Sequence, residues 1–294
     1  MKIGVNLTVD FADEVKLDKG SLRGHNSRCF DRRPVATLLH FRRCSVLKFY
    51  SHRMTTFHVS AHSWYAPLRK PLFWWALGLT IAWDALGLDR WVMAAIGTPQ
   101  GFPLRNHPFV AEVLHTQFKN AMLVLYGLAW LMVFWPLGPV RQFSRGQRWA
   151  AIVGVSLSLV VISSLKRFSA TSCPWDWAEF GGLAQPLSHW AWGVLDGGSG
   201  NCFPGGHASG ALAFLSLAWV GLSAESVAAQ RWGRRLLWTI LGLGALMGVA
   251  QTLRGAHPPS HTLWTAWICA AVGWGCVWAS HCWFVRRAVV SARV

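Results

Sequence analysis

The chain has 294 residues, of which 53% are hydrophobic and only 14% are charged, and it contains 20 Trp. This composition is too apolar for an ordinary soluble domain of that length and favours a membrane protein. The formal charge of +16 would suit a nucleic-acid-binding protein. We exclude that class because the Lys and Arg residues lie between apolar segments and form no module of basic and aromatic residues.

Residues 1–70 are polar and basic and have no apolar signal-peptide core. This composition predicts a disordered cytoplasmic arm that lies against anionic lipid. The alternative is that translation starts at Met54 and that the upstream stretch is a mis-assigned start. Mass spectrometry of the native protein separates the two, because a peptide from residues 1–53 would exclude the later start.

Six apolar runs follow, and a helix needs about 20 mostly apolar residues to cross a bilayer. The runs cover residues 71–88, 118–138, 147–165, 207–223, 233–252 and 261–283. The first run is the shortest and contains Asp84. The sequence therefore predicts an all-α polytopic membrane protein, a bundle of six transmembrane helices over residues 71–283, with a basic tail over residues 284–294.

The basic residues orient this bundle. Of the 28 Lys and Arg, 22 lie in residues 1–70, 139–149, 224–235 and the tail. Cytoplasmic segments of membrane proteins are enriched in Lys and Arg. Both termini are therefore predicted to be cytoplasmic, and the loops after the third and fifth runs are predicted to lie outside.

Four ionisable residues fall at the outer ends of these runs. Lys166 ends the third run, His207 opens the fourth, Arg254 follows the fifth and His261 opens the sixth. A single such residue more often anchors a helix at the interface. Four on the same side indicate a functional site instead. Two cations can hold phosphate oxygens, and two histidines can supply a nucleophile and a proton donor.

Two glycines precede His207 and leave backbone N–H groups free at a helix start. Gly205 and Gly206 therefore predict an anion site beside the two cations. Together with the four ionisable residues, they indicate phosphoryl transfer.

Three motifs carry a family resemblance: "KRFSATSCP", "PGGH" and "LRGAHPPSHTLWT". They resemble the type-2 phosphatidate phosphatase superfamily, to which vanadium haloperoxidases are related. Its pattern is Lys, six residues and Arg-Pro; then Pro-Ser-Gly-His; then Ser-Arg, five residues, His, three residues and Asp. The positions that match are Lys166, Pro174, Gly206, His207 and Arg254.

Several positions depart from this pattern. Cys173 stands where Arg is usual, and Gly205 stands where Ser is usual. Six residues instead of five separate Arg254 from His261, and Thr265 stands where Asp is expected. The motifs are also similar to those of a bacterial subgroup with Cys-Pro-Trp-Asp, Phe-Pro-Gly-Gly-His and Arg-Gly-Ala-His.

The resemblance implies a role for each matching residue. His261 would attack phosphorus, and His207 would protonate the leaving oxygen. Lys166, Arg254 and the Gly206 amide would hold the phosphoryl oxygens. No metal or cofactor is implied.

The departures leave alternatives open. Arg167 could replace the missing Arg, and His257 is a rival nucleophile because of the one-residue shift. The residues that could orient His261 in place of the missing Asp are Ser260, Thr265, Asp176 and Glu179.

Cys173 and Cys202 fall in one outer loop, beside the first and second motifs. In an oxidising exterior they could form a disulfide that ties the Lys166 segment to the His207 turn. The alternative is two unpaired thiols.

The sequence thus predicts a phosphatase for a membrane lipid phosphate or diphosphate, with its site on the periplasmic face of a bacterial inner membrane. Its candidate substrates are phosphatidate, phosphatidylglycerol phosphate, a polyprenyl diphosphate and the 1-phosphate of lipid A. The alternatives are a lipid phosphotransferase of the same fold and a non-catalytic protein that binds lipid phosphates. The partners expected are the lipid substrate and the bilayer, with no nucleic acid.

Overall fold

The computed structural model describes residues 71–291, so the predicted arm, the alternative start at Met54 and residues 292–294 lie outside the described residues. Within residues 71–291 the chain is helical, and no strand is formed. The α-helices are α2 (Pro71–Ala85), α3 (Leu88–Ile96), α4 (Phe118–Phe134), α5 (Arg145–Phe168), α6 (Gly206–Leu212), α7 (Leu215–Leu222), α8 (Val227–Leu253) and α9 (Pro259–Ser291). A π-helical segment, η1 (Phe109–Gln117), leads into α4. The short 3₁₀ segments are η2 (Gly138–Gln142), η3 (Pro174–Asp176) and η4 (Ala178–Phe180).

Local sequence signals explain where the long helices begin. Ser144 and Gln147 form a reciprocal capping box at the start of α5, in which each side chain accepts from the other residue's backbone N–H. Ser226 caps α8 by accepting from the Ala229 amide. Pro259 opens α9, where its missing N–H leaves no helical hydrogen bond unmade.

The predicted apolar runs coincide with helices, but not all are long enough to count as membrane spans. Four segments have the length and composition to cross a membrane: Phe109–Gln142, Arg145–Phe168, Val227–Leu253 and Pro259–Arg287. The first predicted span forms only the 15-residue α2. The fourth forms the shorter segment Gly206–Leu222, which is divided between α6 and α7. The all-α class is therefore confirmed, and the count of six spans stays a prediction.

The core lies where α5, α6, α7, α8 and α9 pack together. Val155, Ile162, Leu212, Leu215 and Ile240 meet there and are buried. Small residues let the helices approach closely, because a Cβ on Gly221 would lie 2.7 Å from the Cα of Gly233. Such small contacts are typical of helices that pack within a membrane.

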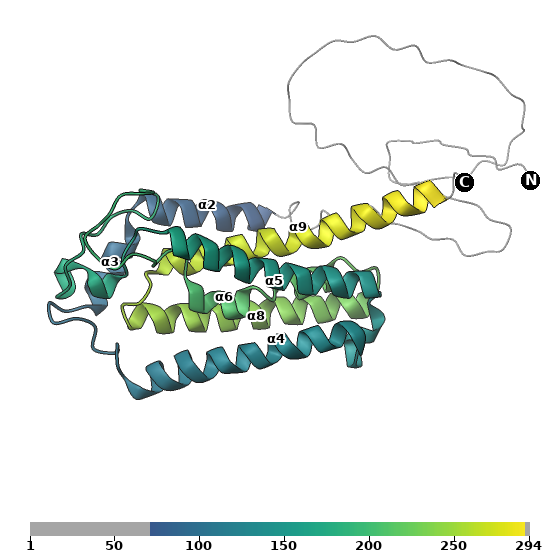
Figure 1. The fold of residues 1–294 in the computed structure, drawn as a ribbon, viewed down its shortest axis with the longest axis horizontal. Helices are drawn as coiled ribbons and strands as arrows, with labels where there is room; N and C mark the ends of the chain where they lie inside the picture. Colours follow the sequence, from purple (N-terminus) through teal and green to yellow (C-terminus); the bar gives the residue numbers. More distant parts are fainter. Residues whose placement is uncertain (1–70, 292–294) are drawn as a thin grey trace, which may run out of the picture. The chain divides into compact units, whose positions relative to one another are not determined.

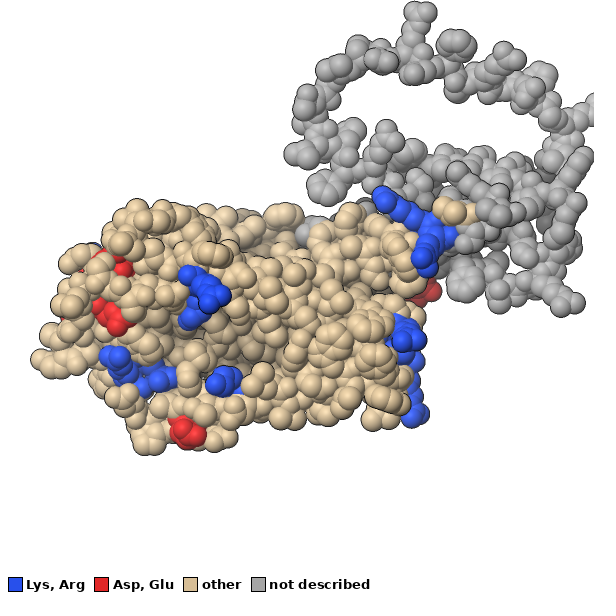
Figure 2. All heavy atoms as spheres, in the orientation of Figure 1, with Lys and Arg blue, Asp and Glu red and all other residues tan. Residues whose placement is uncertain are grey.

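Figure 1 shows α4, α5, α8 and α9 running alongside one another, with α3 and the loops gathered at one end. The loop over residues 169–205, between α5 and α6, belongs to that end. On the face drawn in Figure 2, uncharged side chains cover the middle of the helices, and Lys and Arg lie toward both ends. Apolar side chains of α4 such as Leu123, Val124 and Leu131 are exposed. This surface fits a lipid environment better than water.

Candidate active site

The four ionisable residues predicted to converge come from four different helices. Lys166 lies in the last turn of α5, His207 in the first turn of α6, Arg254 directly after α8 and His261 in the first turn of α9. A Cβ placed on Gly206 would lie 3.4 Å from Cδ and 3.7 Å from Nζ of Lys166, so Lys166 lies against the start of α6. Lys166 is also near enough to His257 to affect its charge.

His261 is buried, with 2% of its surface exposed. Its Nδ1 lies 3.1 Å from the carbonyl oxygen of Cys202. A carbonyl can only accept, so this contact places the ring proton on Nδ1 and leaves the Nε2 lone pair for chemistry. The Cys202 carbonyl thus holds the tautomer that the missing Asp would be expected to hold.

Within residues 71–291, none of the four residues considered for that orienting role has a hydrogen bond to the His261 ring. They bind other partners: Ser260 donates to Asp89, Thr265 donates to the backbone carbonyls of His261 and Gly205, Asp176 accepts from Ser199, and Glu179 pairs with Arg90. A backbone carbonyl performs the task instead, and no residue type in the sequence signals it.

His257, the rival nucleophile, is equally buried and lies between the other two histidines. Its ring centroid is 6.3 Å from that of His207 and 5.8 Å from that of His261. Burial lowers the pKa of His257 well below its usual 6.5, with further lowering by the positive charge of Lys166. His257 is therefore neutral at pH 7, as a nucleophile requires.

Cys173 and Cys202 form a disulfide with an S–S distance of 2.12 Å. His257 Nδ1 lies 3.3 Å from the Cys202 sulfur. The two sulfurs and this ring would have the spacing of metal ligands, within 4.8 Å of one another. They do not fit a metal, because the ligand form of cysteine is the thiolate and these sulfurs are bonded to each other.

The two glycines of the PGGH turn have different surroundings. The Gly205 amide donates to the His261 carbonyl over 3.2 Å, and its own carbonyl accepts from Thr265. We therefore leave Gly205 out of the phosphate site that the sequence assigned to it, because its amide already has a partner. Gly206 begins α6 beside Lys166, and its amide has no partner among the described residues.

Two arginines, Arg254 and Arg167, are predicted from the sequence to hold phosphate oxygens. Arg254 donates through Nε to the carbonyl of Arg105, and one of its terminal nitrogens is buried without a partner in the described part of the chain. Burial, and then the nearby charge of Arg105, lower the pKa of Arg254. The side chain of Arg167 is exposed. Arg254 is near enough to His207 and His115 to affect their charge, so the structure brings it to the histidine cluster.

This geometry agrees with what a family comparison finds. Residues 147–284 match the sequence model of the PAP2 superfamily. This segment, a little under half of the chain, is similar to that superfamily. PAP2 superfamily members are phosphatases or related phosphoesterases. Searches of curated proteins and of solved structures gave no match.

The predicted relation to type-2 phosphatidate phosphatases is therefore confirmed for the superfamily, and the bacterial subgroup stays a prediction. The PAP2 segment contains Lys166, His207, Arg254 and His261. The helices before it, from α2 to α4, supply further side chains to the same end of the bundle.

His115 is a residue of η1 that the sequence analysis missed. Its ring lies against His207, with centroids 4.0 Å apart and planes tilted by 39°. Nε2 of Gln251, in α8, lies 3.3 Å from Nδ1 of His115. The signal that could have revealed His115 is an ionisable residue within a long apolar helix. We missed it because the second predicted span began at residue 118, whereas the helical segment begins at Phe109.

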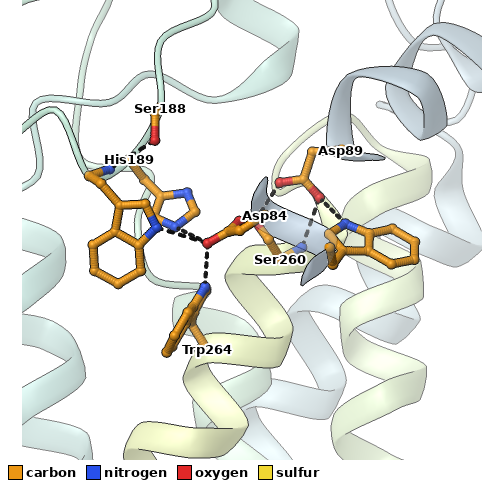
Figure 3. Close-up of polar contacts among 8 residues, drawn as sticks. Asp84, Asp89, Ser188, His189, Ser260 and Trp264 are labelled. Carbon is orange, nitrogen blue, oxygen red and sulfur yellow. Dashed lines mark hydrogen bonds and ion pairs between the residues drawn. The ribbon is translucent and has the colours of Figure 1, made fainter. Parts of the chain in front are cut away.

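Two carboxylates fix the loop before α6 and the start of α9 to α2 and α3. Asp84 accepts from the indole N–H of Trp190 at 2.8 Å and from that of Trp264 at 2.7 Å. Figure 3 shows Asp84 between His189 of the loop and Trp264 of α9. Asp89 accepts from the indole of Trp83 and from the backbone and hydroxyl of Ser260. We call Asp84, Asp89 and these donors the carboxylate clamp.

His189 connects the carboxylate clamp with His261. Its Nε2 lies 3.1 Å from Asp84, and its ring stacks on Phe203 at 4.1 Å and meets His261 edge-on at 5.3 Å. Burial lowers the pKa of His189, and the attraction of Asp84 and Asp89 offsets only part of that effect. The clamp therefore supports one flank of His261 with packed rings, and the His261 ring donates its hydrogen bond to the Cys202 carbonyl.

Proposed function

We propose that this PAP2 protein hydrolyses a phosphate monoester or diphosphate on a membrane lipid, through a phosphohistidine. The observation that carries the proposal is the convergence of Lys166, His207, Arg254 and a neutral buried histidine at one end of apolar helices. Two fixed cations and two imidazoles are the groups that metal-free phosphoryl transfer requires.

The first chemical step transfers the phosphoryl group to the protein. The Nε2 lone pair of His261 attacks phosphorus, and the bond from phosphorus to the lipid oxygen breaks. His207, in its protonated form, gives its proton to that oxygen and becomes neutral, so the lipid alcohol leaves neutral. Lys166, Arg254 and the Gly206 amide hold the three remaining oxygens as charge shifts onto them.

The second step releases phosphate. Water attacks phosphorus, the phosphorus–nitrogen bond breaks, and the electron pair returns to the histidine. His207, which gave up its proton in the first step, takes one from the attacking water. Inorganic phosphate leaves, and both histidines regain their starting states.

The attacking histidine is a choice between two residues. His261 has its Nδ1 proton fixed by the Cys202 carbonyl, which suits it to attack through Nε2. His257 lies next to His207, with ring centroids 6.3 Å apart. We assign the attack to His261, as the sequence analysis does. The assignment stands if His257→Ala keeps phosphate release and His261→Ala loses it, and the reverse result transfers the role to His257.

We assign the site to the outer face of a bacterial inner membrane. The proposal rests on the 22 of 28 Lys and Arg residues in segments predicted to be cytoplasmic. The disulfide beside the site also fits an oxidising compartment. A lipid headgroup would reach the site from within the bilayer, with its chains among the exposed apolar side chains of the helices.

One observation favours a second candidate, a lipid phosphotransferase. His257 and His261 are 3% and 2% exposed, and such burial would shield a phosphohistidine from water. An acceptor lipid would then replace water in the second step.

A panel of phosphorylated lipids tests the proposal. It would contain phosphatidate, phosphatidylglycerol phosphate, a polyprenyl diphosphate and lipid A, each in detergent micelles with the full-length protein. We expect phosphate release from at least one lipid, lost in His207→Ala and His261→Ala and kept in His107→Ala, a variant of an exposed loop histidine. Transfer of label to a second lipid without phosphate release would favour the phosphotransferase. Neither release nor transfer with any lipid would favour a non-catalytic binding protein.

A further inference from the structure

Two buried polar atoms beside His115 have no partner among residues 71–291. One is Oε1 of Gln251, a residue that is 1% exposed, and the other is Nδ1 of His207. Both residues contact His115, Gln251 through its amide nitrogen and His207 through its ring. Buried polar groups in folded proteins almost always have a hydrogen-bond partner, so this pair indicates a small polar ligand at the site.

The chemistry of the two atoms restricts that ligand. An amide oxygen accepts and never donates, so Gln251 Oε1 needs a hydrogen from its partner. Ionised phosphate oxygens carry no such hydrogen, whereas water and alcohols do. An imidazole nitrogen accepts a second hydrogen when its ring is neutral. Water has two hydrogens, so it is a ligand that can donate one to each of these atoms.

The position of these atoms matches one step of the proposed function, on which this inference rests. We propose that Gln251, held in place by His115, binds and orients the water that hydrolyses the phosphohistidine. One hydrogen of the water is bonded to Gln251 Oε1 and the other faces His207. When the water oxygen attacks phosphorus, His207 takes the second hydrogen, and the first stays on the phosphate that leaves.

The assignment gives His115 a positioning role. The Gln251 amide donates to Nδ1 of His115, which directs Oε1 away from that ring. His115 also packs against His207, so one side chain fixes both groups that hold the water. The π-helical turn of η1 places His115 at this point, and π-helical turns recur at functional sites.

Gln251→Leu tests the inference, because leucine keeps the bulk and removes both hydrogen-bonding ends. The full-length protein in micelles is mixed with ³²P-labelled dioctanoyl phosphatidate, or with the panel lipid that it hydrolyses best. Diacylglycerol or the corresponding alcohol, free phosphate and protein-bound label are measured on the scale of one turnover. Gln230→Leu is the matched control, since Gln230 lies in the same helix and donates only to the Ala224 carbonyl.

We expect Gln251→Leu to form phosphoenzyme at the wild-type rate and to break it down about 10²-fold more slowly, as for a misplaced reactant. The protein-bound label then rises to about one phosphoryl group per chain, together with an initial burst of the lipid alcohol. His115→Phe keeps a ring against His207 and should show a smaller accumulation. Gln230→Leu should behave as wild type.

Either of two results in Gln251→Leu would overturn the inference. One is equal slowing of phosphoenzyme formation and breakdown, and the other is breakdown at the wild-type rate. If Gln251→Leu shows no thermal unfolding transition, it is not folded. The rates of phosphoenzyme formation and breakdown in His115→Phe then test the inference instead. Absence of turnover and of labelled protein in the wild type would instead overturn the proposed function. The two failures are therefore distinguishable.

Discussion

The two flanks of the histidine cluster differ in how far their polar groups are satisfied. In the carboxylate clamp, Asp84 and Asp89 accept from indoles, a backbone amide and a hydroxyl. On the other flank, Gln251 Oε1, His207 Nδ1 and one nitrogen of Arg254 have no hydrogen-bond partner within residues 71–291. The one such atom on the clamp side, His189 Nε2, faces the Asp84 carboxylate at 3.1 Å. We call this second set the open flank and include Lys166 in it. Satisfied groups stabilise a frame, whereas unsatisfied ones are available to a substrate.

This comparison predicts that changes in the open flank alter chemistry and that changes in the clamp alter stability. The largest effect should come from Lys166→Met, which keeps the length of the side chain and removes its charge. We expect phosphate release to fall by about 10²- to 10³-fold, as for loss of one group that stabilises transition-state charge. Steady-state rates with the panel lipid, and thermal melting of the same samples, measure both effects.

Arg105→Met is the matched control for that change, because Arg105 is exposed and lies over the ring of Trp175. Its activity should stay within about threefold of wild type. A Lys166→Met protein with full activity would remove Lys166 from the phosphate site.

Reduction of the Cys173–Cys202 disulfide should lower both the stability and the activity of the protein. The bridge closes a loop with a sequence separation of 29. Its loss should destabilise the fold by about 3 kcal/mol. Activity should also fall, since the Cys202 carbonyl orients His261. Thermal melting and activity with and without reductant test this.

The Cys173→Ser/Cys202→Ser double variant should reproduce the effect of the reductant and be insensitive to it. Cys276→Ser, which removes a free cysteine, should melt as the wild type does. A melting midpoint that does not respond to reductant would contradict the structural role of the bridge.

Asp84→Asn is the sharpest change in the clamp. The asparagine side chain has no charge to face His189. It also has only one acceptor oxygen for the two indole donors that bind the Asp84 carboxylate in the wild type. We expect a loss of about 1 to 3 kcal/mol, the cost of a buried donor left unpaired. Well below the new melting temperature, KM and the phosphoenzyme breakdown rate should stay near wild type.

Glu225→Gln provides the control for Asp84→Asn, because Glu225 is exposed in the turn before α8. If Asp84→Asn melts normally and loses activity, the division between clamp and open flank is wrong.

The buried histidines predict how stability depends on pH. Burial lowers the pKa of His257 well below 6.5 in the folded chain, and that of His189 is lowered as well. In the unfolded chain both would titrate near 6.5. Below that pH the unfolded state binds more protons, so stability is full above about pH 7 and declines as the pH falls toward about 5.

Melting curves between pH 8 and pH 5 test this sign. His257→Gln should flatten the dependence, and the exposed-site variant His107→Gln should leave it unchanged. A protein that becomes more stable on acidification would contradict the neutral, buried state of these rings.

The smallest effect is expected for the ion pair between Arg90 and Glu179. The Arg90 side chain is 66% exposed. Exposed pairs contribute about 0 to 1 kcal/mol, and salt screens them. Arg90→Gln should therefore shift the melting midpoint by no more than about 4 °C, and by less in high salt. A larger shift would show that loop 169–205 is held by its outer contacts as well as by Asp84.

Some parts of the fold and site were accessible from sequence and others were not. Apolar runs predicted the long helices because a membrane span needs a fixed length of apolar residues. The motif spacing placed Lys166, His207 and Arg254 correctly at helix ends. The Cys202 carbonyl was missed because every residue has a carbonyl, so sequence cannot single one out. Asp84 was noticed only as an anomaly in a span, since its indole partners lie more than 100 residues away in the chain.

The most direct test of the central claim is to trap the phosphorylated protein. The wild type is quenched during turnover of the ³²P-labelled lipid, and the bound label is tested in acid and in alkali. A phosphohistidine is lost in acid and survives alkali. The account predicts such a label, absent from His261→Ala and present in His257→Ala. Phosphate release without labelled protein would contradict the proposed phosphohistidine. So would a label that survives acid and is lost in alkali.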